Sequence, residues 1–145
     1  MIFEFNYYLD KNLARKASPD KGEAESLMNK AEGRLRYAIK IREITGRTAP
    51  YIFEDIYECL QEAAQSLMSL KGYKSYSPEA LLPFLKEYFT FPESDMAAFD
   101  RYRNLRNKAV DRGEKISVET CHEALKFLLY LLPKLKHQYK KLLEK

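Results

Sequence analysis

The broad apolar surface of the segment from Pro50 to about Lys71 constrains the fold more than any other feature of the chain. A helix that is apolar over so much of its circumference must be covered by neighbours on several sides. The sequence therefore predicts a central helix inside a bundle of other helices. The apolar positions that define this surface are Ile52, Phe53, Ile56, Tyr57, Leu60, Ala63, Ala64, Leu67, Met68 and Leu70.

Capping and turn residues divide the rest of the chain into further helices. Pro19 and Glu23 stand beside Asp20 in the spacing of a helix start, and Gly46 can end that helix. Ser117 is an N-cap residue for the last helix. The proline inside each of two predicted helices indicates a bend or an irregular turn. The predicted helices cover residues 18–46, 50–71, 77–89, 94–110 and 117–145.

The fold class follows from what these segments share. No segment shows sustained alternation of apolar and polar residues, and no Asn-Gly or Asp-Gly hairpin dipeptide occurs. Short connections favour antiparallel neighbours. We therefore predict an all-α, up-and-down helical bundle of four main helices plus a short fifth. One domain covers residues 1–145, with residues 1–17 as an N-terminal arm that packs on it.

Composition and cysteine spacing narrow the classes of protein. No apolar run approaches the roughly 18 residues that would span a bilayer, and the first residues lack the pattern of a secretory leader. We expect a cytoplasmic protein with no membrane contact. Cys59 and Cys121 lie far apart on apolar helical positions and are predicted to be buried free thiols. Neither a metal site nor a cofactor is expected.

The net charge of +4 permits an anionic partner without requiring one. Most of the excess positive charge lies in the last predicted helix. Two interpretations stay open for this basic end: a helix face turned toward water, or a nucleic-acid contact. The lysines concerned are Lys134, Lys136, Lys140, Lys141 and Lys145.

Two arginines interrupt the apolar pattern of the helix predicted at 94–110. Arg103 and Arg106 fall on a stripe beside its core face. A guanidinium buried alone is costly, so both need carboxylate, phosphate or carbonyl partners. Such partners could be Glu54, Asp55 or Glu58 of the central helix, for purely structural reasons. Alternatively, the stripe forms a cleft or an interface that binds an anion.

Residues 102–117 resemble the signature segment of HEPN domains, the higher eukaryotes and prokaryotes nucleotide-binding family. Residues 8–13, 31–35, 70–77 and 82–85 are also similar to that family and occur in its order, so the resemblance covers nearly the whole chain. It is strongest to stand-alone prokaryotic and archaeal members. The resemblance implies an all-α bundle, usually a homodimer, that often acts as a metal-independent endoribonuclease in toxin–antitoxin, defence or RNA-processing systems. Many family members are instead inactive RNA-binding or scaffold proteins.

Active HEPN members resemble one another in an arginine, usually followed by asparagine or another polar residue, then four to six positions, and then a histidine. Arg106 and Asn107 match the first pair, whereas Asp111 stands where the family places histidine. Attack of a 2′-hydroxyl on the adjacent phosphate needs a base, and the departing oxygen needs an acid. An aspartate with a pKa near its reference value of about 3.9 is ionised at neutral pH, so it is a weak base, cannot act as an acid and repels phosphate. Asn107 and Asp111 can instead hydrogen-bond to each other where the helix ends.

Two further departures concern regulation and a second histidine. Gly113 occupies the position where members silenced by a nucleotidyltransferase partner often carry a modified tyrosine. Pro78 occupies the position of a histidine that is common in related proteins. The two histidines present, His122 and His137, are expected at the surface or the edge of the core.

The sequence therefore predicts a HEPN-like, catalytically degenerate RNA- or partner-binding protein that dimerises across the face bearing Arg103, Arg106 and Asn107. One alternative is a metal-independent endoribonuclease that uses Arg106 and Asn107, with Asp111 in the histidine position. Another is a scaffold or antitoxin-like subunit that partners a nucleotidyltransferase. The residues predicted to contact RNA are Arg103, Arg106, Lys108 and Arg112.

Overall fold

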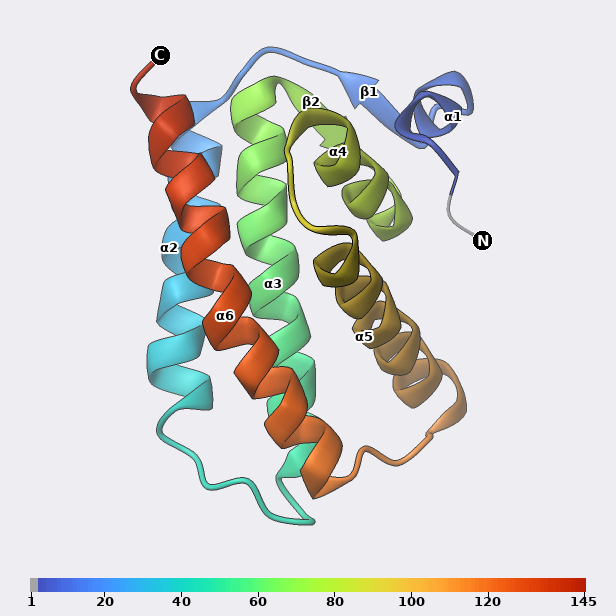
Figure 1. The fold of residues 1–145 in the computed structure, drawn as a ribbon, viewed down its shortest axis with the longest axis vertical. Coiled ribbons are helices and arrows are strands. Elements are labelled where there is room, and N and C mark those ends of the chain that lie inside the picture. Colours follow the sequence, from blue (N-terminus) through green and yellow to red (C-terminus); the bar gives the residue numbers. More distant parts are fainter. Residues whose placement is uncertain (1–2) are drawn as a thin grey trace.

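Helix α3 (Ala49–Lys71) runs through the middle of the molecule in the computed structural model, which describes residues 3–145 (Figure 1). Fourteen of its 23 residues are buried, and they include Phe53, Tyr57 and Leu60. The helix begins at Ala49 with Pro50 in its first turn and ends at Gly72. The predicted central helix is thus confirmed, with bounds within one residue of those expected.

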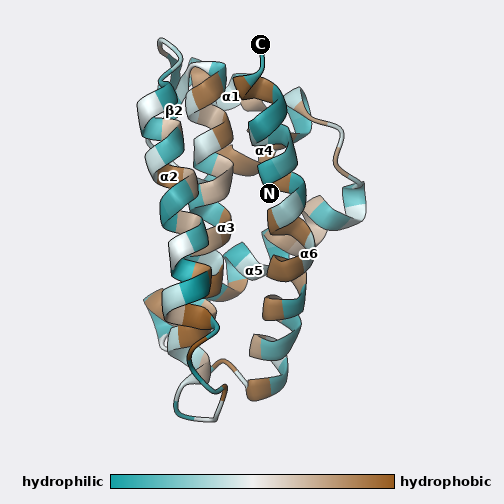
Figure 2. Ribbon diagram, turned by 90° about the vertical axis from the view of Figure 1, so that its left-hand side faces the viewer, coloured by the Kyte–Doolittle hydropathy of each residue, from teal (hydrophilic) through white to brown (hydrophobic). Residues whose placement is uncertain are grey.

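Helices and two short strands make up the rest of the described chain. Helix α2 lies on one side of α3 and helices α4 and α5 lie on the other, while α6 crosses in front of α2 and α3 (Figure 1). Brown and teal bands alternate along the helices, as expected for amphipathic helices that each bury one face (Figure 2). The elements are α1 (Phe5–Asp10), β1 (Ala14–Lys16), α2 (Lys21–Arg34), the π-helix η1 (Leu35–Ile39), β2 (Tyr73–Ser75), the 3-10 turn η2 (Pro78–Ala80), α4 (Leu81–Tyr88), α5 (Glu93–Arg112) and α6 (Val118–Leu143).

This arrangement confirms the predicted all-α bundle. The four long helices α2, α3, α5 and α6 run alternately down and up in Figure 1, and α4 is the short fifth. The Asp20 side chain accepts the Glu23 backbone N–H at 2.9 Å. Ser117 caps α6 in the same way by accepting the Thr120 N–H at 3.1 Å. Both predicted helix starts therefore form through the hydrogen bonds that their sequences indicate.

The first long helix ends earlier than predicted. It widens into η1, where the Lys40 N–H donates to the Leu35 carbonyl at 2.9 Å, and no helix continues to Gly46. A π-turn inserts one extra residue per turn and so rotates the following side chains off the buried face. Ile41, which continues the helical spacing of Leu27, Ala31 and Leu35, lies beyond η1 and is 71% exposed.

The N-terminal arm packs on the bundle through α1, as predicted. Phe5 and Tyr8 are both 1% exposed. The Phe5 ring makes edge contacts with Tyr73 and Phe84, at centroid distances of 5.3 and 5.6 Å. The arm is thus held by aromatic packing against β2 and α4.

A two-stranded antiparallel sheet, which the sequence does not predict, ties the arm to the chain after α3. Strand β1 pairs with β2, with Arg15 opposite Lys74. Three-residue strands are too short to show alternation in a sequence. Gly72 lies at the junction with a φ of 82°, and a Cβ there would come within 2.7 Å of the Ala17 carbonyl oxygen. Glycine is therefore required for the two segments to approach.

Both cysteines are free and buried, as predicted. Burial raises the pKa of Cys59 to about 12 and that of Cys121 to about 11. No helix within residues 3–145 is long and apolar enough to cross a membrane. Within the same residues, no group of three or more His, Cys, Asp or Glu side chains is arranged to hold a metal ion.

Candidate anion-binding site on helix α5

The C-terminal half of α5 passes from the core to the surface. Arg103 is 8% exposed, whereas Lys108, Asp111 and Arg112 are exposed near the end of the helix. Gly113 then ends the helix with a φ of 67°. The candidate residues are therefore spread along a helix that leaves the bundle, and only those from Arg106 onward face water fully or in part.

Arg103 is engaged within the chain. It donates to Asp100 Oδ1 at 2.9 Å and lies 3.8 Å from Glu79 of η2. Two carboxylates therefore compensate its charge on the inner side of α5. Asp100 is three residues away on the same helix, and Glu79 belongs to a distant segment, so neither was among the partners expected from the central helix.

The charge of Arg103 also acts on a residue of the N-terminal arm. Burial raises the pKa of the Tyr8 hydroxyl in α1, and the charges of Glu79 and Arg103 act on that hydroxyl in opposite directions. Tyr8, Glu79 and Arg103 come from α1, η2 and α5. The Arg103–Glu79 contact joins two segments that lie 24 positions apart in the sequence.

Arg106 is held by the central helix. Its Nη2 donates to Glu58 Oε1 at 2.8 Å, and its guanidinium lies 5.6 Å from the centre of the Tyr57 ring. Burial raises the pKa of Tyr57 to about 12, against the opposing effect of the charges of Arg103 and Arg106. The expected pairing of a motif arginine with the central helix is thus present for Glu58 but not for Asp55.

The Arg106 side chain keeps unused hydrogen-bonding capacity despite this pairing. Its Nε is buried and has no hydrogen-bond partner within the described residues, and 28% of the side chain stays exposed. A guanidinium has five N–H donors in a planar fork that matches phosphate or carboxylate. The open part of the guanidinium can therefore bind an anion while Glu58 fixes its position.

Asn107 and Asp111 do not close the helix by bonding to each other: no hydrogen bond joins them in the described part of the chain. Instead the Gly113 N–H donates to the Ala109 carbonyl and the Glu114 N–H to the Lys108 carbonyl. This termination uses the left-handed conformation of Gly113. A tyrosine at position 113 would be strained there, which fits the absence of the family's modified tyrosine.

Neither histidine belongs to α5. His122 and His137 lie on α6, outside the buried core. Within α5, Asp111 occupies the position where active HEPN members carry their acid–base histidine. The geometry therefore provides cations that can bind an anion, without a side chain on this helix that suits proton transfer near neutral pH.

A second charged cluster, which the sequence patterns did not reveal, joins α2 and the segment after η1 to α3. Arg34 donates to both carboxylate oxygens of Glu62, at 3.0 and 3.1 Å, and to Asp55 at 2.8 Å. Arg42 also donates to Asp55, and Lys30 lies 3.5 Å from Glu62. Hydrogen bonding to Glu62 raises the pKa of Arg34 above its already high value. Asp55 and Glu62 are seven residues apart, which places them on one helix face and could have indicated this cluster.

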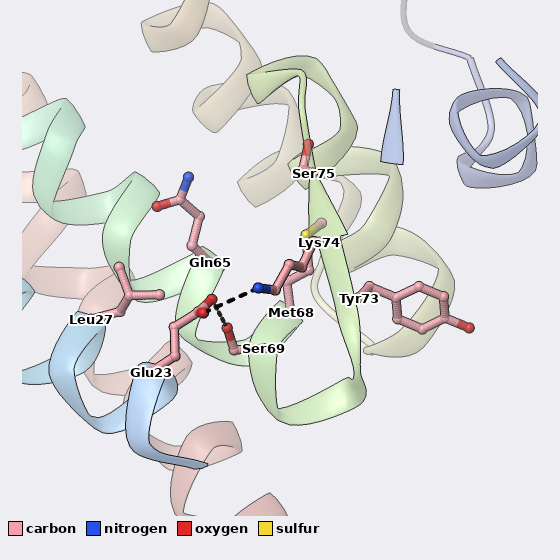
Figure 3. A pocket seen from close by; sticks show the side chains of 8 residues that line it. All are labelled: Glu23, Leu27, Gln65, Met68, Ser69, Tyr73, Lys74 and Ser75. Carbon is pink, nitrogen blue, oxygen red and sulfur yellow. Dashed lines mark hydrogen bonds and ion pairs between the residues drawn. The ribbon is translucent and has the colours of Figure 1, made fainter. Parts of the chain in front are cut away.

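A small pocket at the other end of α2 has a polar mouth (Figure 3). Glu23 accepts a hydrogen bond from the Ser69 hydroxyl at 2.5 Å and lies 3.8 Å from the Lys74 ammonium. The Tyr73 ring points away from these groups (Figure 3). Because Glu23 and Lys74 already compensate each other's charge, the pocket has weak attraction for an ion of either sign.

No protein-family model, no curated protein and no solved structure matches the chain. The similarity to HEPN domains therefore rests on the residues and motifs themselves.

Proposed function

We propose that the protein is a HEPN-like RNA-binding protein in which the catalytic motif has degenerated. The observation that carries the proposal is the state of Arg106, which Glu58 and Tyr57 hold in place while 28% of its side chain stays exposed. A positioned guanidinium can bind a phosphate without a neighbouring acid–base group. Asp111, an exposed aspartate, stands where the family's histidine would shuttle the proton.

The convergence of the motif segments supports the HEPN-like assignment. The Arg103–Glu79 contact joins the α5 motif to the turn that follows β2, and the charges of both residues act on the Tyr8 hydroxyl. These residues lie in or beside three of the stretches that resemble the family. Lys108 and Arg112 extend the positive charge from Arg106 along the exposed end of α5. RNA phosphates are the anions that suit this series, in a toxin–antitoxin, defence or RNA-processing setting.

Dimerisation belongs to the same proposal. Because Arg103 is covered by its own chain, the accessible part of the predicted face includes Asn107 and Val110, and Val110 is 54% exposed. A two-fold contact here would cover Val110 and place the motifs of both copies side by side. Light scattering should give twice the mass of 17.1 kDa, and Val110→Glu should give the single mass. A monomer at all concentrations would remove dimerisation from the proposal.

The first experiment measures cleavage and binding on the same RNA. Purified protein is incubated with labelled single-stranded and structured RNA in EDTA, and the products are resolved on a denaturing gel. We expect intact RNA together with binding that weakens as salt rises. Cleavage to a 2′,3′-cyclic phosphate that Asp111→Asn and Arg106→Ala both abolish would favour the endoribonuclease alternative. Absence of both binding and cleavage would overturn the proposal.

Two variants test the roles of Asp111 and Arg106 more sharply. Asp111 is exposed, so Asp111→His should fold normally and would restore the family pattern; cleavage gained only in this variant would show that the missing histidine alone prevents catalysis. Exchanging the pair with Arg106→Glu and Glu58→Arg keeps the ion pair but moves the guanidinium to α3. We expect near-normal stability and weaker RNA binding from the exchanged pair. Equal binding in the exchanged and native proteins would argue against Arg106 as the phosphate contact.

A further inference from the structure

A row of three aromatic rings with a cation at each end crosses from α5 to α6, outside the site described above. The Arg101 guanidinium lies 4.9 Å from the centre of the Tyr102 ring, and the Lys134 ammonium lies 4.8 Å from that of Tyr130. Phe127 lies between the two tyrosines, with centroid distances of 5.5 Å to Tyr102 and 6.4 Å to Tyr130. We call these five residues the aromatic row.

The α6 end of the aromatic row is open to solvent. Tyr102 is 4% exposed and supports the row from below, whereas Tyr130 is 45% exposed. Leu129, next to Tyr130, is also 45% exposed. The Tyr130 hydroxyl donates to Asp95 Oδ2 at 2.9 Å, which fixes the ring relative to α5. An anchored ring with an accessible surface is suited to stacking against a planar group.

A surface pocket continues the aromatic row beyond Lys134. It has a volume of about 310 Å³ and lies between α6 and the loop that joins α4 to α5. Lys134 lines this pocket together with His137 and Phe91. The cation at the end of the row therefore also stands at the edge of a hollow that could receive the next part of a chain-like ligand.

The positive charge of α6 favours a negatively charged ligand. From Ala124 to Leu143 the helix contains five lysines and no acidic residue. Lys136 is paired with Glu32, but no carboxylate within the described residues lies at ion-pair distance from Lys126 or Lys134. Asp95, the acidic group beside Tyr130, is 8% exposed and accepts the tyrosine hydroxyl. The exposed side of the row is therefore cationic.

We infer that the aromatic row binds single-stranded RNA, with a base stacked on Tyr130 and phosphates contacted by Lys134 and Lys126. Aromatic side chains flanked by cations are how proteins bind single strands without reading sequence, because every base has a π face and every link carries a charge. In the free protein Lys134 lies over the Tyr130 ring. A phosphate would draw its ammonium aside and leave the ring to the base. The inference rests on the proposed RNA-binding function, and it adds to the Arg106 contact a second RNA-binding surface.

The test uses a fluorescein-labelled twelve-nucleotide oligouridylate and a duplex RNA of the same length, with binding measured by anisotropy at 0.1 M salt. We expect the single strand to bind more tightly than the duplex. Tyr130→Leu keeps an apolar side chain but removes the stacking ring, and it should weaken binding about tenfold. Tyr130→Phe removes only the hydrogen bond to Asp95 and should bind within about twofold of the native protein.

Charge variants separate a specific contact from general attraction. Lys134→Gln should weaken binding about fivefold at 0.1 M salt. Each phosphate contact to a single strand raises log affinity by about 0.7 for each tenfold decrease in salt concentration, and 0.1 M is tenfold below the 1 M reference. Lys11→Gln removes the same charge from the N-terminal arm and should have a smaller effect. RNA binding that is equally tight in Tyr130→Leu, Lys134→Gln and Lys11→Gln would overturn the inference and leave the proposed function standing. No binding of either RNA by the native protein would overturn both.

Discussion

Cations at the α2–α3 interface and cations on the exposed face of α6 are paired differently. At the interface, Arg34 of α2 and Arg42, which follows η1, are matched by Asp55 and Glu62 of α3. On α6, Lys134 lies over a tyrosine ring and has no carboxylate partner in the described part of the chain. A cation that the chain itself neutralises at an interface serves the fold. A cation left for water remains available to a ligand.

The α5 arginines lie between these two extremes. Arg103 is 8% exposed and has two carboxylate neighbours, while Arg106 has one and keeps a free Nε among the described residues. Arg103 is therefore paired in the same way as the arginines of the α2–α3 cluster. Arg106 makes one structural hydrogen bond and keeps N–H donors that this bond does not use. We therefore expect Arg106 variants to affect both stability and binding.

The largest effect is expected at the α2–α3 interface. Arg34→Ala would leave Glu62, which is 5% exposed, without its bidentate partner. Removing one member of such a pair should lower the free energy of unfolding by about 3 kcal/mol. For a chain of this length the melting temperature should fall by roughly 10 °C. Urea and thermal unfolding followed by circular dichroism measure both quantities.

Lys30→Ala provides the matched control because Lys30 contacts the same carboxylate from the surface, at 3.5 Å, with 66% of its side chain exposed. We expect a change below about 0.5 kcal/mol. If Lys30→Ala and Arg34→Ala destabilise the protein equally, burial does not distinguish the two cations. The contrast between buried cations of the α2–α3 interface and exposed cations of α6 would then be unsupported.

The second-largest effect is expected from alkaline pH, which should weaken the same α2–α3 interface. Burial raises the pKa of Cys59 from 9.0 to about 12, so the folded state keeps the thiol protonated after the unfolded chain has begun to ionise. The stabilisation is complete below pH 9 and diminishes as pH rises from 9 toward 12. The urea midpoint should therefore be lower at about pH 10 than at about pH 8.

A Cys59→Ala, Cys121→Ala double variant tests the cause of this change. Its urea midpoint should fall less between about pH 8 and about pH 10 than that of the native protein, because no thiol remains to ionise. In the native protein Cys121, whose pKa is raised only to about 11, should react with iodoacetamide before Cys59 does as pH rises. The reverse order of labelling would contradict the idea that the α2–α3 interface is the drier environment.

An intermediate effect is expected for Arg106 and Glu58, whose side chains are 28% and 31% exposed. A double-mutant cycle with Arg106→Ala and Glu58→Ala should give a coupling free energy of about 1 kcal/mol, at the upper end for a partly exposed pair. Denaturant unfolding of the four proteins measures it. A coupling near zero would mean that the contact does not hold Arg106 in place, and the case for a pre-positioned phosphate contact would weaken.

The sequence predicted those parts of the fold that depend on neighbouring residues. Asp20 and Ser117 cap helices through bonds to residues three positions away, and the apolar face of α3 follows from spacing alone. The early end of the first helix was missed because the π-turn in η1 has no marker residue. The pairing of β1 with β2 was missed because its two segments are distant in the sequence and only three residues long each.

The candidate site shows the same limit. The suggestion that a motif arginine pairs with the central helix was right for Arg106, because Glu58 was one of three carboxylates offered by that helix. Arg103 instead meets Glu79, whose position depends on how η2 packs and not on any periodicity. The aromatic row also combines two helices, so its cations and rings appear in sequence only as unrelated residues. Whether the motif binds RNA stays a prediction.

The smallest change in stability is expected for the α6 lysines. Lys126→Gln with Lys134→Gln should alter the free energy of unfolding by less than about 0.5 kcal/mol, because neither lysine has a carboxylate partner among the described residues. For oligouridylate binding by the native protein, log affinity falls linearly with the logarithm of the salt concentration. The same variant should make this slope shallower by about 0.7 for each of the two lysines that contacts a phosphate in the native complex. Urea unfolding and anisotropy at several salt concentrations measure the two quantities on one preparation. If the variant is instead destabilised by more than about 1 kcal/mol and its salt slope is unchanged, Lys134 is a structural cation held by the Tyr130 ring. The α6 lysines would then not differ in role from the arginines of the α2–α3 interface.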